Sequence, residues 1–549
     1  PFGLSATDAS TPSVTPIDLL DSINQLFDES GSITGQYAVI QTKQALHAPG
    51  PLHATDPNPI HLYATSGDIS GLTLFSGKSA RVVAGQDLTD LSLYIQNDNA
   101  TNLTVVAAGR DLIAYDPNSS LRTAAQATGN ELLPSNSTTP GPASGNPDAG
   151  DIQISGPGTL EVLAGRNLDL GVGVGGGDGT GVGITSIGNA RNPYLPFTGA
   201  DIIAGAGLGV ASSLAASPLD FAAFETEFLN PSTAGGSAVL YLPDLAALMG
   251  LSNTSLNGTW AAFNQLSADQ RDQLALQIFY LVLRDSGRNH SVATSAGFGN
   301  YNAGFAAISA LFPKPAASGD ISLTSREIET ASGGNIELLA PAGGVTVGFN
   351  VAGAQAVDQG ILTEDGGNIS IFTKDSAIVG TSRIFTLRGG NEIIWSSTGD
   401  IAAGASSKTV QSAPPTRVLI DPQSGDVKTD LAGLATGGGI GVLETVAGVA
   451  PGDVDLIAPV GAVNAGDAGI RVSGNLNISA VTVLNSSNVQ VGGTSVGTPA
   501  TVATSLAGAL SAASSVSAAG NAAVDTVTRP AKPQDQAPEP DSLITVEVL

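Results

Sequence analysis

The chain has 549 residues, and its 48 acidic against 21 basic residues give a net charge of −27. This balance, with no run of Lys or Arg, disfavours a nucleic acid or an anionic membrane as partner, because either would need a basic patch. No apolar run reaches the ~18 residues of a membrane span, and no cysteine is present to form a disulfide.

Residues 1–45 are expected to form an N-terminal lead-in segment. Residues 17–27 have apolar side chains at helical spacing and predict a short helix. The sequence begins at Pro1, with neither an initiator Met nor a signal peptide, so we expect it to be a piece of a longer protein.

Residues 46–215 and 319–492 are expected to form two parts of one repetitive β structure. Their shared phrase is a glycine, then Asp or Asn, then alternating apolar residues, which predicts a turn with a positive φ at the glycine followed by a short strand. The phrase begins at Gly67, Gly150, Gly319, Gly334, Gly367, Gly399, Gly452 and Gly474. Residues 334–348 also align without gaps to residues 452–466. A unit this small cannot bury its apolar face alone, so the pattern predicts stacked coils, a parallel β-helix.

Residues 216–318 interrupt this pattern and are expected to form an α-helical insertion with a small core of its own. Aromatic residues are concentrated there, and Ser267 with Gln270 predicts a capping box. Gly287 is the expected stop of the following helix. Residues 493–540 are expected to be an Ala/Ser-rich and Pro-rich linker, and residues 541–549 a terminal strand that completes a sheet edge in a neighbouring copy or in its own β-helix.

Several long phrases resemble the C-terminal region of the filamentous haemagglutinin family of large bacterial exoproteins. They are residues 63–76, 80–88, 105–119, 279–290 and 319–344, with the closing residues 544–549. The resemblance implies a right-handed parallel β-helix and export through an outer-membrane transporter β-barrel, as in two-partner secretion. It also implies a role in adhesion or surface structure. The signal peptide and secretion domain of that family are not found in this sequence, and neither is an Arg-Gly-Asp tripeptide.

Two sets of residues were considered as metal ligands. His47, His53 and His61 share a Pro-rich stretch, but their spacing, and that of the distant His290, matches no familiar metal site. A second set consists of acidic residues in expected loops, where Ca²⁺ ligation competes with simple capping of turns. These are Asp56, Asp98, Asp116, Asp178, Asp365 and Asp421. No metal, cofactor or catalytic residue is assigned from either set.

The function expected from the sequence is that of a secreted or cell-surface protein. It would be an elongated structural or adhesive rod or filament component that attaches to other cells, surface glycans or matrix. Specificity is expected in the insertion and in the loops near residues 116–150 and 405–425. The alternative is a secreted polysaccharide-degrading β-helix enzyme. For this function Asp320, Glu327 and Glu329 would supply carboxylates beside the basic side chain of Arg326. No G-x-S-x-G elbow is evident, and the chain is expected not to be an enzyme.

Overall fold

A computed structural model describes residues 47, 49–50, 55–116, 119, 150–171, 182–208, 219–233, 235–314, 318–348, 360–405, 410–411, 418–420, 427–429, 435–445 and 448–499. The chain divides into two compact units, Pro1–Pro499 and Ala500–Leu549, and all described residues belong to the first. The predicted helix at 17–27, most of the loop near 116–150, the linker beyond residue 499 and the terminal strand lie outside the described residues, as do His53, Asp178 and Asp421.

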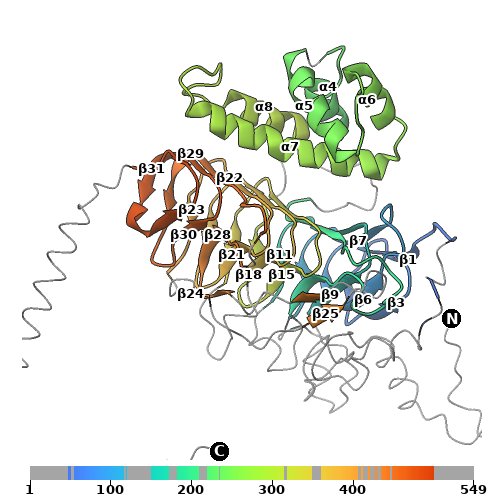
Figure 1. Cartoon of the computed structure of the whole chain (residues 1–549). Coiled ribbons are helices and arrows are strands. Elements are labelled where there is room, and N and C mark those ends of the chain that lie inside the picture. The colour runs from blue at the N-terminus through green and yellow to red at the C-terminus, as the bar shows by residue number, and fades with distance from the viewer. Residues whose placement is uncertain are drawn as a thin grey trace, which may run out of the picture. The chain divides into compact units, whose positions relative to one another are not determined.

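The first unit is a parallel β-helix, as the sequence predicts, and its strands form three faces (Figure 1). Face 1 contains β1 (Ile60–Ala64), β4 (Ala80–Ala84), β7 (Leu103–Ala108), β10 (Thr159–Ala164), β13 (Asp201–Gly205), β16 (Ile336–Ala340), β19 (Ile369–Thr373), β22 (Glu392–Ser396), the first halves of β29 (Val454–Asn464) and β31 (Leu476–Leu484), and β33 (Ser495–Val496). The last of these strands lies a few residues beyond the predicted limit of 492.

Face 2 continues each coil after a corner. It contains β2 (Ile69–Ser70), β5 (Leu88–Thr89), β8 (Leu112–Ile113), β11 (Leu168–Asp169), β14 (Ile321–Ser322), β17 (Val345–Val347), β20 (Ala377–Val379), β23 (Ile401–Ala402) and the second halves of β29 and β31. Because β29 runs around the corner without a break, faces 1 and 2 join into one 19-stranded sheet.

Face 3 is a separate 10-stranded sheet. It contains β3 (Thr73–Ser76), β6 (Ser92–Gln96), β9 (Asp151–Ser155), β12 (Gly183–Ser186), β15 (Glu327–Thr330), β18 (Gly360–Thr363), β21 (Arg383–Thr386), β28 (Gly439–Val442), β30 (Ile470–Val472) and β32 (Val489–Val491). Between β23 and β28, β24 (Val410–Gln411) pairs antiparallel with β27 (Ala435–Thr436), and β25 (Val418–Ile420) with β26 (Val427–Thr429). This excursion begins within the predicted 405–425 loop and extends beyond it to Thr436.

Stacked aliphatic side chains fill the interior of the β-helix. On face 1, for example, Val162 of β10 is in register with Ala204 of β13, which is in register with Leu338 of β16, and all three are fully buried. The buried residues of this core cluster are Ala, Val, Leu and Ile only. Narrow coils leave room for such side chains but not for large rings, which agrees with the low aromatic content.

The repeated glycine phrase forms the corners of the coils. A Cβ atom at Gly367 would lie 2.1 Å from the carbonyl oxygen of Gly334 in the preceding coil, so close backbone contact requires glycine. The predicted positive φ is present at Gly334 and Gly367 but not at Gly452 and Gly474, where the close approach alone is decisive. The two aligned segments, 334–348 and 452–466, occupy equivalent positions: β16 with β17 in one coil, and β29 in another.

Five helices lie between β13 and β14, within the predicted insertion: α4 (Phe221–Phe228), α5 (Gly236–Leu248), α6 (Leu256–Phe263), α7 (Ala268–His290) and α8 (Asn302–Leu311). The capping box of Ser267 and Gln270 opens α7 as predicted. The predicted stop at Gly287 is wrong, because α7 continues to His290. This glycine instead allows close packing, since a Cβ atom there would lie 2.3 Å from Cγ1 of Ile457 in β29.

The helices have a buried core that is separate from the interior of the β-helix, but they do not close it alone. Their buried residues form one cluster with outward-facing side chains of face 1, including Leu339, Phe372, Trp395 and Ile457. Trp395 is fully buried on the outside of β22 because Tyr301 and Phe305 cover it, with ring centroids at 6.0 and 5.6 Å. The insertion and the β-helix therefore share their apolar packing, and each depends on the other for burial.

Candidate functional site

Two outward-facing rows of side chains on face 1 underlie the helices. The strand register places Leu163, Gly205, Leu339, Phe372, Trp395 and Ile457 in one row, the apolar row. It places Arg81, Val105, Glu161, Ile203, Glu337, Ser370, Ile393 and Asp455 in the other, the polar row. The apolar row packs against the helices, as do Ile203 and Ile393 of the polar row. The charged residues of the polar row line two cavities beside α7.

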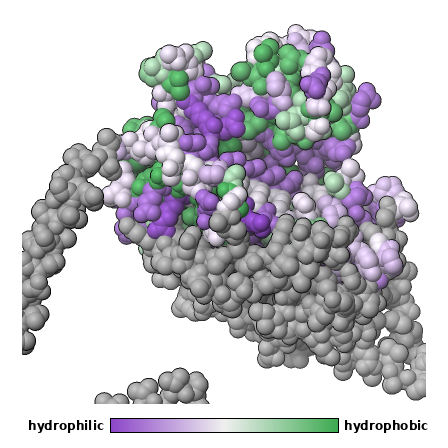
Figure 2. All heavy atoms as spheres, in the orientation of Figure 1, coloured by the Kyte–Doolittle hydropathy of each residue, from purple (hydrophilic) through white to green (hydrophobic). Residues whose placement is uncertain are grey.

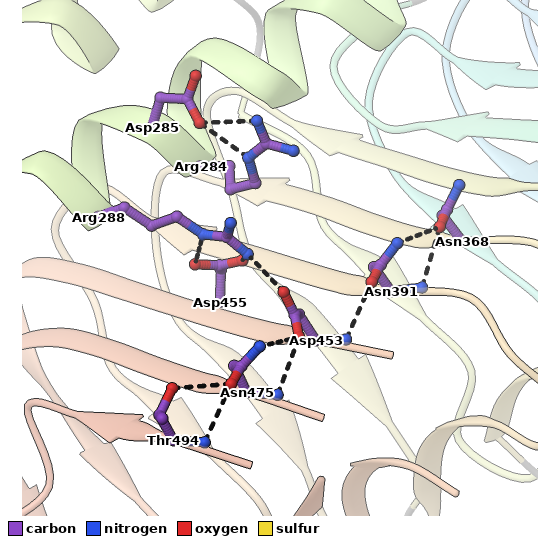
Figure 3. Close-up of polar contacts among 9 residues, drawn as sticks. All are labelled: Arg284, Asp285, Arg288, Asn368, Asn391, Asp453, Asp455, Asn475 and Thr494. Carbon is purple, nitrogen blue, oxygen red and sulfur yellow. Dashed lines mark hydrogen bonds and ion pairs between the residues drawn. The ribbon is translucent and has the colours of Figure 1, made fainter. Parts of the chain in front are cut away.

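Helix α7 lies across face 1 and is tied to the polar row near both of its ends. Close to its start, Asp269 accepts a hydrogen bond from Nη2 of Arg81 in β4 at 3.1 Å. Close to its end, Arg288 donates to both carboxylate oxygens of Asp455 in β29, at 2.8 and 2.7 Å (Figure 3). In between, Oη of Tyr280 donates to the carbonyl oxygen of Leu338 in β16 at 2.8 Å. One helix therefore contacts strands of many successive coils and holds them in a fixed relation.

The larger cavity lies between strands β1 to β16 of face 1 and helices α4 and α7, and has a volume of about 770 Å³. Its charged lining residues are Arg81, Glu161, Asp220, Asp269 and Asp272. Burial raises the pKa of Glu161 to about 7, and the charge of Asp269 adds to the shift while that of Arg81 opposes it. Burial also raises the pKa of Asp272 to about 6. Two carboxyl groups here therefore titrate near neutral pH.

The smaller cavity has a volume of about 270 Å³ and lies along α7 at the beginning of the face 1 strands. Arg284, Arg288, Glu337 and Asp455 line it, together with amide side chains of the corner. Glu337 is 5% exposed, and burial raises the pKa of its carboxyl well above the usual range. Arg284 pairs with its neighbour Asp285, so only Arg288 of these two arginines reaches across to the β-helix (Figure 3).

An amide ladder runs along this corner from coil to coil (Figure 3). In each step the backbone N–H of one residue donates to Oδ1 of the ladder residue in the preceding coil, over 2.6–3.0 Å. The members are Asp201, Asn335, Asn368, Asn391, Asp453, Asn475 and Thr494. The residue just before each face 1 strand has a backbone N–H that is not yet part of the strand-to-strand hydrogen bonds. The Asp or Asn of the repeated phrase in the preceding coil accepts a hydrogen bond from this group.

Comparison with protein families gives a match for the coils at the C-terminal end of the ladder. Residues 389–500, from β22 to β33, match the family described as filamentous haemagglutinin family outer membrane protein. The C-terminal coils are therefore similar to this family. The resemblance predicted from the sequence is thereby confirmed for the C-terminal part of the chain. No curated protein and no solved structure matches the chain.

The matched segment, residues 389–500, contains Asp453, Asp455 and the last ladder residues, whereas the larger cavity lies outside it. The match supports an adhesin-like exoprotein, secreted or at the cell surface. No helix among the described residues is long and apolar enough to span a membrane.

The histidines considered from the sequence have separate neighbours. The ring of His47 contacts the carbonyl oxygen of Arg191 at 2.9 Å, that of His61 contacts the hydroxyl of Tyr63 at 2.6 Å, and that of His290 stacks on Tyr301 at 4.2 Å. Across the described ranges, no group of three or more His, Asp or Glu side chains could hold a metal ion. The structure therefore gives no support to a histidine metal site in this part of the chain.

The acidic residues considered as Ca²⁺ ligands contact nearby side chains and turns. Asp56 pairs with Lys78 at 2.5 Å, which is the main reason that its pKa falls to about 2. Asp98 accepts from Gln96 at 2.8 Å, and Asp365 pairs with Arg388 at 3.2 Å. Asp116 donates its backbone N–H to Asp90. Asp56 also accepts the backbone N–H of Asn58 at 3.1 Å, which is a turn-capping contact, whereas the other contacts named here are ion pairs or hydrogen bonds with side chains.

The four residues considered for polysaccharide cleavage lie at different places in the coil. Asp320 is part of a second corner ladder before face 2, where it accepts from the N–H of Gly344 at 2.8 Å. Glu327 and Glu329 flank the core residue Ile328 on face 3, and Arg326 lies over the ring of Tyr115. The cavity carboxylates Glu161 and Asp272 were not singled out. The sequence could have indicated Glu161, because it is the one charged residue in the otherwise mostly apolar strand 159–164.

Proposed function

We propose that the chain is the structural and adhesive part of a surface-attached or secreted exoprotein that mediates attachment to cells, surface glycans or matrix. The observation that carries the proposal is the family match of residues 389–500 within a parallel β-helix. A solenoid of this kind is a stiff scaffold that displays loops and insertions along its length. Export through an outer-membrane transporter β-barrel, and self-association through the terminal strand, belong to the same proposal.

We expect the surface of the helical insertion to make the contact with cells, surface glycans or matrix. Apolar side chains reach solvent there, as Figure 2 shows around α4, α5 and α6. Val239 and Leu240 of α5 are 59% and 64% exposed. Exposed neighbouring apolar groups on an otherwise polar protein are typical of interaction sites.

Electron microscopy of the producing bacterial cells, with a gold-labelled antibody against the insertion, tests the location. Label on the cell surface or on surface fibres is the expected result. An attachment assay with purified Val239→Asp/Leu240→Asp protein then tests the contact surface, with Ile378→Asp on face 2 as control because that side chain is 41% exposed. Loss of attachment only in the double variant supports the proposal, and equal attachment by all three proteins contradicts the assignment of the surface.

A polysaccharide-degrading enzyme is the second candidate, and one observation favours it. The carboxyl of Glu161, with its pKa raised to about 7, has the property of a general acid and lines a large cavity. We propose that the chain is nevertheless not an enzyme. Incubation with acidic and neutral polysaccharides should release no reducing ends, whereas turnover that disappears in Glu161→Gln would establish the enzyme.

A further inference from the structure

The larger cavity combines apolar walls with an excess of carboxylates. Leu163, Ile203 and Leu339 of face 1 form one wall, and Leu219, Phe221 and Leu276 of the helical insertion form the opposite wall. At about 770 Å³ the space is in the range of protein cavities that hold small organic molecules. It is built from two parts of the chain that already share a packed core, so its walls are held in place.

Two of the four carboxylates that line the cavity already have partners. Asp269 is bound by Arg81 at 3.1 Å, and Arg81 is the only Lys or Arg among the described residues that line the cavity. Asp220 accepts the N–H of Ala223 at 2.9 Å and caps α4. Glu161 and Asp272 have no hydrogen bond or ion pair with any described residue. The cavity thus contains two carboxylates in a partly desolvated place where an unpaired negative charge is costly.

These features select the ligand by its chemistry. An anion would be repelled by the carboxylates, and a neutral apolar molecule would leave them unpaired. A divalent metal ion would need a cluster of oxygen ligands, which the described residues do not form. We propose that the cavity between face 1 and helices α4 and α7 binds an organic cation, an ammonium or guanidinium group on an apolar body, with Glu161 and Asp272 as the charge partners.

The cation can come from a free amine or from a Lys or Arg side chain of a partner peptide, because both present the same group. The proposal does not rest on the adhesive function, since it concerns a cavity of the purified protein. A chain that attaches to no cell would still bind the cation, and a chain that binds no cation could still be an adhesin. The two proposals therefore fail separately.

Isothermal titration of the purified chain with three probes of one length tests the charge requirement: 3-phenylpropylammonium, 3-phenylpropanol and 3-phenylpropanoate. The ammonium should bind most tightly, and the carboxylate should not bind. Glu161→Gln and Asp272→Asn should each weaken ammonium binding about tenfold or more. Glu227→Gln, which removes a charge from an exposed site on α4 outside the cavity, should leave binding unchanged.

An acetylated Leu-Lys-Phe amide and its norleucine analogue distinguish the two sources. Tighter binding of the lysine peptide than of the simple ammonium indicates a peptide partner, and the reverse order indicates a free amine. Both results support the cation site. Equal affinity for ammonium and alcohol, or no binding of any probe at about 10 mM, overturns it. The comparison of probes on the unaltered chain needs no variant and so holds even if a substitution disturbs folding.

Discussion

Arg288 and Asp455 form a two-point ion pair that fastens the end of α7 to β29. Nε and Nη2 of the guanidinium donate to the two carboxylate oxygens at 2.8 and 2.7 Å, and the Asp455 side chain is only 2% exposed. The buried carboxylate has its pKa raised by burial, a shift that Arg288 opposes. Arg288 therefore neutralises the buried charge of Asp455, which would otherwise have no ionic partner among the described residues beside the shared core.

Replacing Arg288 should destabilise the protein more than replacing the arginine one turn earlier. Arg288→Gln leaves Asp455 buried without its partner, and we expect a loss of about 2–3 kcal/mol in the free energy of unfolding. Arg284→Gln breaks only a pair with the adjacent Asp285 and should cost less than about 1 kcal/mol. Chemical denaturation of both variants measures the difference. Equal losses would show that the bond to the β-helix adds nothing beyond surface charge.

Gly287→Ala should destabilise the protein although alanine favours helices. The new Cβ atom would lie 2.3 Å from Cγ1 of Ile457, so α7 must move away from β29, and we expect a cost of about 1–3 kcal/mol. Gly236→Ala at the start of α5, where no atom lies within 4 Å of the new Cβ, is the control and should be neutral or slightly stabilising. Thermal unfolding reports both effects. A stabilising Gly287→Ala would mean that the helix does not approach the strand so closely.

The amide ladder should depend on acceptance by Oδ1. Asn368→Ala removes the acceptor of the Asn391 N–H, which lies 2.9 Å away, and should cost about 1 kcal/mol. Asn368→Asp keeps that oxygen and loses only the donation to Asn335, so its cost should be smaller. Denaturant titration can order the two variants. If aspartate is as harmful as alanine, the side-chain donation is the more important half of the ladder.

Stability should fall as the pH rises from about 4 to about 7. The folded pKa values of Glu161, about 7, and of Asp272 and Asp151, about 6, lie above the values of 4.5 and 3.8 for the unfolded groups. The folded chain therefore holds more protons than the unfolded chain in this range. Their stabilising contribution is complete below pH ~4 and is lost as the pH rises through the folded pKa values.

Glu161→Gln tests one of these three contributions, because glutamine stays neutral at every pH. The melting temperature of the variant should fall less steeply than that of the unaltered chain between pH 5 and pH 7. Parallel melting curves across this range would mean that Glu161 has an ordinary pKa. The control Glu227→Gln, at an exposed position, should follow the unaltered chain.

The repeated phrase was enough to predict the coils, because glycine, Asn or Asp and alternating apolar residues carry local information. The sequence predicts a strand directly after Asn335 and after Asn368, and in the structure these residues precede β16 and β19 and link neighbouring coils. The capping box at Ser267 was readable for the same reason, since its contacts lie within one helical turn. Such patterns also located the helical insertion between two β blocks.

The sequence by itself determined the parallel β-helix, its interruption by helices and the family resemblance of its C-terminal coils. Only the tertiary structure decided that the helices share their core with Phe372 and Trp395, that Gly287 is a contact point and not a stop, and that Glu161 and Asp272 meet in one cavity. The physical reason is the range of the interactions. Turns, caps and strand alternation act over a few residues, whereas the contacts of α7 with β4 and β29 join residues more than 100 positions apart along the chain.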